Sequence, residues 1–206
     1  NIQLLLHNRN RGDLFSETRF AHLVESFGAI GKDPNGGVTR LAFSPEDVLA
    51  RNRIIELMQN EYHLDVRVDA WGNIFGRRQG SRSDLPPIVF GSHTDSVANG
   101  GMFDGPVGSL SAIEVAQVIN ERQITTRHPL EVVIFTDEEG GLVGSKALIG
   151  ELTPGAVQQV SHSGKTISEG IKALGGDPAL LENVVRSKGE VAAYIEIHIE
   201  QGRILD

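Results

Sequence analysis

The stretch that decides the fold reads Pro87-Ile88-Val89-Phe90-Gly91-Ser92-His93-Thr94-Asp95. A short apolar run, typical of a buried strand, leads directly into an imidazole and a carboxylate. The chain then passes Gly100-Gly101 and presents a second carboxylate, Asp104, followed by Gly105. Because glycine lets the backbone turn tightly, Asp104 can return to the vicinity of His93. We predict a strand whose carboxyl end carries potential metal ligands.

Two further runs end in the same way. Val132-Val133-Ile134-Phe135 leads into Thr136-Asp137-Glu138-Glu139-Gly140, and the alternating run at 191–200 presents His198 between two glutamates on one face. Open α/β sheets bind their ligands outside the carboxyl ends of the strands. Three such clusters at three predicted strand ends indicate a metallohydrolase.

Each cluster also has a structural explanation when it is taken alone. The run at 191–200 could be a solvated edge strand on which His198 has no function. Asp104 could be an acidic residue that stabilises the amino-terminal end of a helix. Glu138 and Glu139 could be a solvated surface pair. The occurrence of all three clusters at strand ends favours a shared metal centre.

The remaining patterns predict an α/β fold. Apolar runs predict strands at 64–68, 73–77, 87–92, 130–136 and 191–200. Helical spacing and capping residues predict helices at 16–27, 45–61 and 107–122, with shorter helical pieces between 140 and 190. Strands that alternate with helices form sheets with helices on their faces. We therefore predict a mixed, mostly parallel sheet with helices on both faces.

The composition argues against several classes of protein. The chain has 206 residues, is 39% hydrophobic and carries a formal charge of −8; it therefore lacks the basic balance typical of nucleic-acid binding. It has no cysteine, which excludes disulfides, thiolate metal sites and cysteine nucleophiles. No run approaches the roughly 20 apolar residues of a membrane span. We expect a small-molecule substrate, no nucleic-acid or membrane partner, and a cytoplasmic location.

Three motifs together carry a resemblance to a known family. They are GSHTDSVANGGMFDGPVG at 91–108, FTDEEG at 135–140 and YIEIHIEQGRIL at 194–205. From about Phe15 to Asp206 the sequence resembles the hydantoinase/carbamoylase family of dinuclear amidohydrolases. That family includes N-carbamoyl-L-amino-acid hydrolases, allantoate amidohydrolases and β-ureidopropionases, and it belongs with the aminoacylase-like metallopeptidases. The resemblance implies a catalytic domain of the zinc-peptidase type.

The resemblance also assigns metal ligands. It implies that His93 and His198 bind a first divalent ion, that Glu139 binds a second, and that Asp104 bridges the two. Histidine and carboxylate ligands without cysteine are compatible with zinc, manganese, cobalt or nickel. In the family, the second ion also takes a histidine from much later in the chain, which here would lie beyond Asp206.

Three further roles follow from the resemblance. Glu138 is the general base that accepts a proton from water, Asp95 orients His93, and Gln201 helps to bind substrate. The implied reaction is hydrolysis of a linear amide or ureido C–N bond, as in an N-carbamoyl amino acid or an allantoate-like compound. Two alternatives stay open: a metallopeptidase or N-acyl amino-acid deacylase on the same centre, and a non-catalytic metal-binding relative.

The sequence departs from the family pattern around the Glu pair. Many carbamoylase relatives carry Asn before the pair and Ser-Arg-Phe after Glu-Glu-Gly, whereas this chain has Asp137 before it and Gly141-Leu142-Val143-Gly144 after it. The departure leaves the metal ligands intact and affects only the expected substrate.

The resemblance finally implies a longer protein. Residues 1–206 correspond to the amino-terminal portion of the catalytic domain, and a dimerisation or lid domain and the rest of the catalytic domain are expected beyond Asp206. We expect a homodimer at full length. We also expect the sheet formed by residues 1–206 to lack its final strands and to leave a sheet edge or an apolar face exposed.

Overall fold

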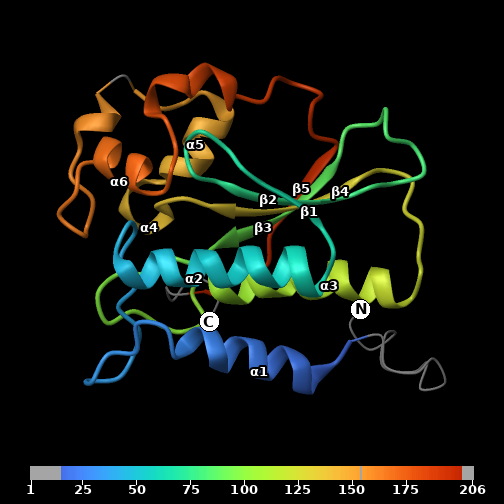
Figure 1. Ribbon diagram of the computed structural model, residues 1–206, viewed down its shortest axis with the longest axis horizontal. Coiled ribbons are helices and arrows are strands. Elements are labelled where there is room, and N and C mark those ends of the chain that lie inside the picture. Colours follow the sequence, from blue (N-terminus) through green and yellow to red (C-terminus); the bar gives the residue numbers. More distant parts are fainter. Residues whose placement is uncertain (1–14, 154, 201–206) are drawn as a thin grey trace.

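A mixed sheet forms the centre of the computed structural model, which describes residues 15–153 and 155–200 (Figure 1). Its five strands lie in the order β1-β2-β4-β3-β5. Their bounds are β1 Asp65–Val68, β2 Ile74–Arg78, β3 Ile88–His93, β4 Leu130–Phe135 and β5 Ala193–Ile195. β2 is antiparallel to both β1 and β4, whereas β3 is parallel to both β4 and β5. The three predicted clusters follow β3, β4 and β5, so they meet at one end of the sheet.

Helices cover both faces of this sheet, as the sequence predicts (Figure 1). The helices α1 (Glu17–Gly28), α2 (Pro45–Glu56) and α3 (Pro106–Glu121) lie on one side. The short α4 (Glu138–Gly141) follows β4 directly, and α5 (Val143–Ile149) and α6 (Ile167–Ala173) lie on the other side. Shorter helical turns are η2 (Leu57–Glu61), η3 (Ala156–Gln158) and η4 (Pro178–Asn183). No helix in the described part of the chain is long and apolar enough to span a membrane.

Local sequence accounts for the first two helix starts. Ser16 and Ser44 each accept a hydrogen bond, at 3.2 Å, from the backbone amide three residues further on. Serine is a favoured N-cap because its hydroxyl satisfies an amide that has no partner within the helix. The helix predicted at 45–61 is not uniform, since α2 ends at Glu56 and a π-helical turn, η2, completes the segment.

The strand β4 is buried on both faces, which explains its continuous apolar sequence. Val132 and Ile134 belong to the hydrophobic cluster that includes residues of α1, α2 and α3. Val133 and Phe135 point to the opposite face and pack in the cluster that contains Leu148 of α5. With strands on both sides and helices on both faces, β4 fixes the position of the residues that follow it.

The strand β5 is shorter than predicted. We predicted a strand over 191–200, but only Ala193–Ile195 join the ladder. These residues pair with β3 alone, and among the described residues no strand lies on the outer side of β5 to hold a longer segment. Side chains continue to alternate between the two faces beyond the ladder. Ile195 and Ile197 both line an apolar groove of about 290 Å³ against β3 and α3. The two residues are nevertheless 56% and 55% exposed.

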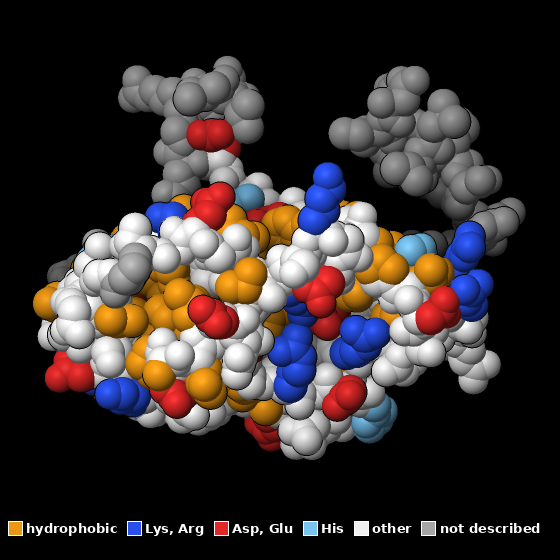
Figure 2. Space-filling view, turned by 90° about the horizontal axis from the view of Figure 1, so that it is seen from above, with side chains coloured by type: hydrophobic (Ala, Val, Ile, Leu, Met, Phe, Trp, Pro, Cys, Tyr) orange, Lys and Arg blue, Asp and Glu red, His pale blue; other side chains and the backbone are white. Residues whose placement is uncertain are grey.

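The face that carries α5 and α6 is seen from above in Figure 2. Lys and Arg side chains gather near the middle of this view, with hydrophobic side chains beside them. On the same side of the sheet, Arg67, Arg77 and Arg186 form ion pairs with the buried carboxylate of Glu131 in β4. Arg67 and Arg186 also lie over the ring of Phe75. These contacts connect β1, β2 and the segment that carries Arg186 to the central strand β4.

Candidate metal centre

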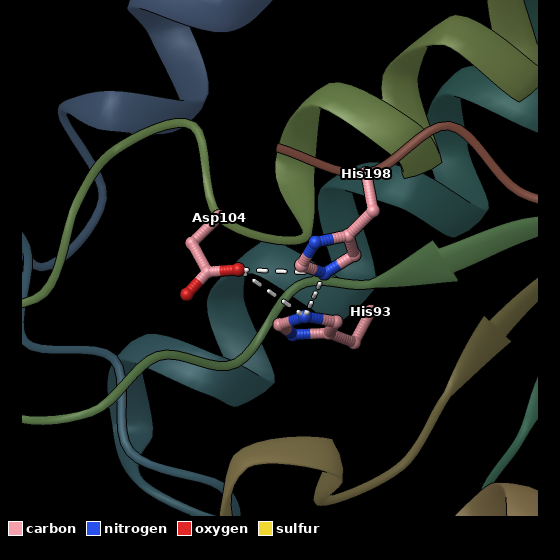
Figure 3. Close-up of side chains that lie close together, drawn as sticks. All are labelled: His93, Asp104 and His198. Atoms are coloured by element: carbon pink, nitrogen blue, oxygen red, sulfur yellow. Dashed lines mark hydrogen bonds and ion pairs between the residues drawn. The ribbon is translucent and has the colours of Figure 1, made fainter. Parts of the chain in front are cut away.

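Three side chains from separate elements converge at the carboxyl ends of the parallel strands (Figure 3). His93 is the last residue of β3, Asp104 precedes α3, and His198 follows β5. One nitrogen of each imidazole and one oxygen of the carboxylate all lie within 4.8 Å of one another. The structure thus brings together three of the four metal ligands that the sequence predicts.

The distances between these atoms fit a single small cation. His198 Nε2 lies 3.5 Å from His93 Nε2 and 3.4 Å from Asp104 Oδ1, and His93 Nε2 lies 3.9 Å from the same oxygen. Ligand atoms bound to one tetrahedral ion at ~2.1 Å are about 3.4 Å apart. Two imidazoles and one carboxylate form the donor set of many catalytic zinc sites, which leave a further position open. The residues present therefore fit a divalent ion.

Backbone contacts set the orientation of both imidazoles. His93 Nδ1 lies 3.0 Å from the backbone oxygen of Asp95, and His198 Nδ1 lies 3.0 Å from the backbone oxygen of Ile199. A carbonyl oxygen can only accept, so each Nδ1 carries the proton and donates it. In the neutral imidazole each Nε2 then keeps its lone pair, and both Nε2 atoms face Asp104. This is the tautomer that binds a metal ion through Nε2.

Close packing holds the His93 ring in place. The side chain is 1% exposed, and Ser109 Oγ of α3 donates a hydrogen bond at 2.7 Å to the backbone oxygen of His93. Gly105 lies directly against the ring, because a Cβ atom at this position would be 2.5 Å from His93 Nδ1. The φ angle of Gly105 is also +78°, a value that glycine adopts readily. Both features require glycine at position 105.

Two glutamates at the start of α4 add acidic groups to the site. Glu138 Oε2 lies 3.6 Å from His93 Nε2. Burial raises the pKa of Glu138, and the nearby His93 opposes this shift. Burial raises the pKa of Glu139 to about 7, and the charge of Asp104 and a hydrogen bond between the two side chains add to the shift. Carboxylates held this close together are stabilised by a cation that lies between them.

Asp95 connects the ends of β3 and β4. Its carboxylate accepts hydrogen bonds from the backbone amides of Glu138 at 3.3 Å and Glu139 at 3.1 Å. The carboxylate lies 3.7 Å from His93 Nδ1, whereas the backbone oxygen of Asp95 is closer to that nitrogen, at 3.0 Å. The sequence led us to expect that Asp95 orients His93. In the structure the backbone carbonyl makes the shorter contact with the ring, and the carboxylate positions the Glu pair.

Known proteins share this combination of sequence and fold. Residues 73–163, which include His93, Asp104 and the Glu pair, match the peptidase family M28. Over 195 residues the chain is 46% identical to an N-carbamoyl-L-amino acid amidohydrolase of Geobacillus stearothermophilus. A hydantoinase/carbamoylase family amidase from Burkholderia ambifaria has the same fold, with a TM-score of 0.82 and 34% identity. Over this span the chain belongs to the hydantoinase/carbamoylase family.

This hydantoinase/carbamoylase chain spans about half the length of the relatives that it matches. The match covers 92% of the chain but 47% of the Geobacillus protein, and 93% of the chain but 47% of the Burkholderia amidase. A probable allantoate deiminase of Oryza sativa subsp. japonica is 36% identical over 184 residues, which are 84% of the chain and 37% of that protein. The comparisons therefore concern this half of those proteins.

The other predicted site residues lie at different places around His93, Asp104 and His198. Glu139 adjoins Asp104 through a side-chain hydrogen bond, although it lies outside the group of three ligands. Glu138 faces His93. Gln201 lies outside the described residues. The described part of the site thus brings together three side chains that fit one ion, and Glu139 lies beside one of them, Asp104.

Sequence analysis did not identify a buried arginine next to the metal centre. Arg40 is buried and donates hydrogen bonds to the backbone oxygens of Thr94 at 2.5 Å and Ile30 at 2.8 Å. These bonds fix the backbone between His93 and Asp95. Nothing in the Gly-rich segment 31–42 distinguishes Arg40 from a surface arginine, since its burial depends on contacts with residues far away in the sequence.

Proposed function

We propose that this chain forms the first part of the catalytic domain of a metal-dependent amidohydrolase, which cleaves a linear amide or ureido C–N bond. The convergence of His93, Asp104 and His198 beside Glu138 carries this proposal. A substrate of the N-carbamoyl amino acid or allantoate type is supported by two relatives, an N-carbamoyl-L-amino acid amidohydrolase and a probable allantoate deiminase.

Four side chains hold two divalent ions in this proposal. His93 and His198 bind the first ion, Glu139 binds the second, and Asp104 contributes to both. Support comes from the distances within the group of three and from the hydrogen bond between Glu139 and Asp104. Zinc, manganese, cobalt and nickel all suit these ligands. When bound, the ions polarise the scissile carbonyl and make water a nucleophile near neutral pH.

Glu138 acts as the general base. Its carboxylate accepts a proton from the attacking water and delivers that proton to the leaving nitrogen as the C–N bond breaks. Asp95 supports this step because its carboxylate holds the backbone amide of Glu138 at 3.3 Å. Partial burial keeps the pKa of Glu138 above its ordinary value, which makes the carboxylate a stronger base toward the attacking water.

The remainder of the site is proposed to come from the half of the protein that this chain does not span. The chain matches 47% of the Geobacillus relative, and in this proposal Asp104 and Glu139 are the described residues that bind the second ion. We propose that a further histidine ligand and the substrate-binding residues of a lid or dimerisation domain lie in the other half. Gln201 is proposed to contact substrate, and the full-length protein is proposed to be a homodimer.

A peptidase or N-acyl amino-acid deacylase is the second candidate. The match of residues 73–163 to the peptidase family M28 favours it. Peptides, N-acyl amino acids and ureido compounds all present a carbonyl to the same kind of metal centre, so the site as described accommodates each reaction. A non-catalytic role is disfavoured because the chain retains a carboxylate at position 138, where the base is needed.

Turnover of matched substrates separates these candidates. The purified full-length protein, loaded with zinc or manganese, is assayed with an N-carbamoyl-L-amino acid, with allantoate and with a dipeptide, and its metal content is measured in parallel. We expect about two metal ions per protomer and hydrolysis of a ureido substrate well above that of the dipeptide. Faster hydrolysis of the dipeptide would establish the second candidate. Bound metal without any turnover would establish a non-catalytic protein.

A further inference from the structure

His93 and His198 keep the register of the strands to which they belong, although the ladder ends before it reaches them. In the β3–β5 ladder, Ile88 pairs with Ala193 and Phe90 pairs with Ile195. These partners are 105 positions apart, and the same offset separates the two histidines, whose Nε2 atoms lie 3.5 Å apart. The ladder stops at Ile195. Something other than the ladder must therefore hold the segment that carries His198.

Glu196 makes the contacts that fill this gap. Ser92 Oγ, at the end of β3, donates a hydrogen bond to Glu196 Oε1 at 2.6 Å. The hydroxyl of Tyr194 donates a hydrogen bond to Glu196 Oε2 at 2.6 Å and also lies 3.3 Å from the backbone oxygen of Gly91. Glu196 is therefore hydrogen-bonded to Tyr194 of β5 on one side and to Ser92, the residue that precedes His93, on the other.

The helix α3 shows how closely the same segment is packed. A Cβ atom at Gly108 would lie 2.3 Å from the backbone oxygen of Ile197 and 2.8 Å from Ser92 Cβ. The end of β3, the segment after β5 and the first turns of α3 thus meet around Ser92. In this place a side-chain bridge from Ser92 to Glu196 limits how far the backbone at His198 can move away from His93.

We infer that Glu196 is a positioning residue, which bridges Ser92 and Tyr194 and thereby keeps His198 opposite His93 so that both imidazoles bind one cation. Glu196 does not bind the cation in this arrangement, and it acts only through the backbone of the segment that carries His198. The inference rests on the proposed function, because it takes His93 and His198 as ligands of one ion. It adds a residue that determines how tightly this half of the protein holds that ion.

Glu196 could also strengthen metal binding through its negative charge alone. Two substitutions separate this effect of charge from the effect of the hydrogen bond to Ser92. Ser92→Ala removes the bridge but leaves the charge of Glu196 in place. Glu196→Gln removes the charge but keeps an oxygen that can accept the hydrogen bond from Ser92. If the bridge is what matters, the first change weakens metal binding and the second largely preserves it. If the charge is what matters, the order is reversed.

Zinc affinity of the purified full-length protein is the measurement, obtained by competition with a chromophoric chelator. We expect Ser92→Ala and Glu196→Ala each to weaken zinc binding about tenfold or more, the size of effect typical for residues that support metal ligands. The double variant should bind no more than about twofold more weakly than either single variant, because both changes break the same bridge. Glu182→Ala, which removes an exposed charge on η4, is the control and should leave the affinity unchanged.

Visible absorption of the cobalt(II) form provides a readout that general loss of stability does not change. The intensity of the cobalt bands depends on the number and geometry of the ligands, so loss of His198 should alter the spectrum of Glu196→Ala while Glu196→Gln retains it. Circular dichroism of each metal-free variant shows that the fold is kept.

The outcomes distinguish this inference from the proposed function. Zinc binding by the unsubstituted protein with unchanged affinity in Ser92→Ala and Glu196→Ala would overturn the inference alone. Additive losses in the double variant, or a loss in Glu196→Gln equal to that in Glu196→Ala, would also overturn it. Failure of the unsubstituted protein to bind zinc or cobalt would overturn the proposed function and the inference with it.

Discussion

The carboxylate of Asp95 accepts a hydrogen bond from the backbone amide of Glu139 at 3.1 Å. The loop after β3 is thereby tied to the loop after β4, and the residues that follow these two strands cannot move independently. Because His93 contacts the backbone oxygen of Asp95, one residue positions an imidazole on one side and the Glu pair on the other. The geometry of the candidate metal centre therefore depends on Asp95, even though Asp95 is not among the three grouped side chains.

Asp95→Asn should weaken the site and the fold together. An asparagine side chain has one acceptor oxygen, so one of the two backbone amides loses its partner in a buried place. We expect the free energy of unfolding of the metal-free protein to fall by about 1–3 kcal/mol and zinc affinity to fall as well. Chemical denaturation and chelator competition measure the two effects. Asp65→Asn, at an exposed position of β1, is the control, and equal behaviour of both variants would contradict the role given to Asp95.

The two members of the Glu pair should respond differently to amide substitution. Glu138→Gln should keep its metal and lose at least about 100-fold in turnover, because an amide cannot accept the proton of the attacking water. Glu139→Gln should release the second ion more readily, since an amide oxygen is a poorer ligand than a carboxylate. Metal analysis of both purified variants, together with their kcat values, tests this. Equal loss of metal from both variants would mean that the roles have been assigned wrongly.

Gly105→Ala should disturb the position of the His93 ring more than the same substitution at a nearby glycine. The added Cβ would lie 2.5 Å from the His93 ring, and the φ angle of +78° adds strain. We expect a loss of about 2–4 kcal/mol in the free energy of unfolding and strongly reduced zinc binding. Gly101→Ala is a matched control, since a Cβ at Gly101 meets no heavy atom within 4 Å. Similar losses in both variants would contradict this account.

Asp137→Asn should stabilise the metal-free protein in a pH-dependent way. Burial, together with the nearby Asp95 and Asp47, raises the pKa of Asp137 to about 7, and the backbone amide of Gly140 opposes this shift. An unfolded aspartate ionises near pH 3.9, so the folded state loses stability as the pH rises from about 4 to 7. Asparagine does not ionise. The free energy of unfolding of Asp137→Asn should therefore exceed that of the unsubstituted protein by an amount that grows over this range to roughly 2–4 kcal/mol and then stays constant. A difference in unfolding free energy that does not change between pH 4 and 7 would contradict this prediction.

The polypeptide of residues 1–206, produced alone, should be inactive and should self-associate. It spans about half of its relatives, and the side chains of Ile195 and Ile197 are exposed at the β5 edge. Unpaired strand edges with apolar side chains favour association. Ile195→Glu should shift the sedimentation profile toward the monomer, whereas Leu49→Glu, at an equally exposed position of α2, should not. Turnover by this fragment comparable to that of the full-length protein would contradict the expectation.

Four of the five strands were predictable from the sequence, and the length of β5 was not. β3 and β4 are buried on both faces, and the predicted bounds, 87–92 and 130–136, lie within one residue of the observed ones. The run at 191–200 has the alternation of a strand, yet only Ala193–Ile195 pair. Alternation reports which side chains share a face, whereas pairing also needs a neighbouring strand. Among the described residues that neighbour exists only on the side of β3.

The convergence of the candidate metal ligands could be predicted because histidine and carboxylate side chains are the residue types that bind divalent ions. His93, Asp104 and His198 follow strands or glycines in a pattern that brings their side chains to one place. Residues that act through shape or through a hydrogen bond carry no such signal. The contact of Gly105 with the His93 ring and the bond between Ser92 and Glu196 both join elements that only the tertiary fold brings together.

The separation of the two histidines by 105 positions has a consequence for folding. A cation bound by both imidazoles cross-links the chain across a long loop, and the entropic cost of closing such a loop must be met before the contact can form. Because β5 is held by only three paired residues, this cross-link should form late and open early. Metal chelation should therefore accelerate amide hydrogen exchange in β5 before it affects β4, so that the last strand of this region reports the metal content of the protein.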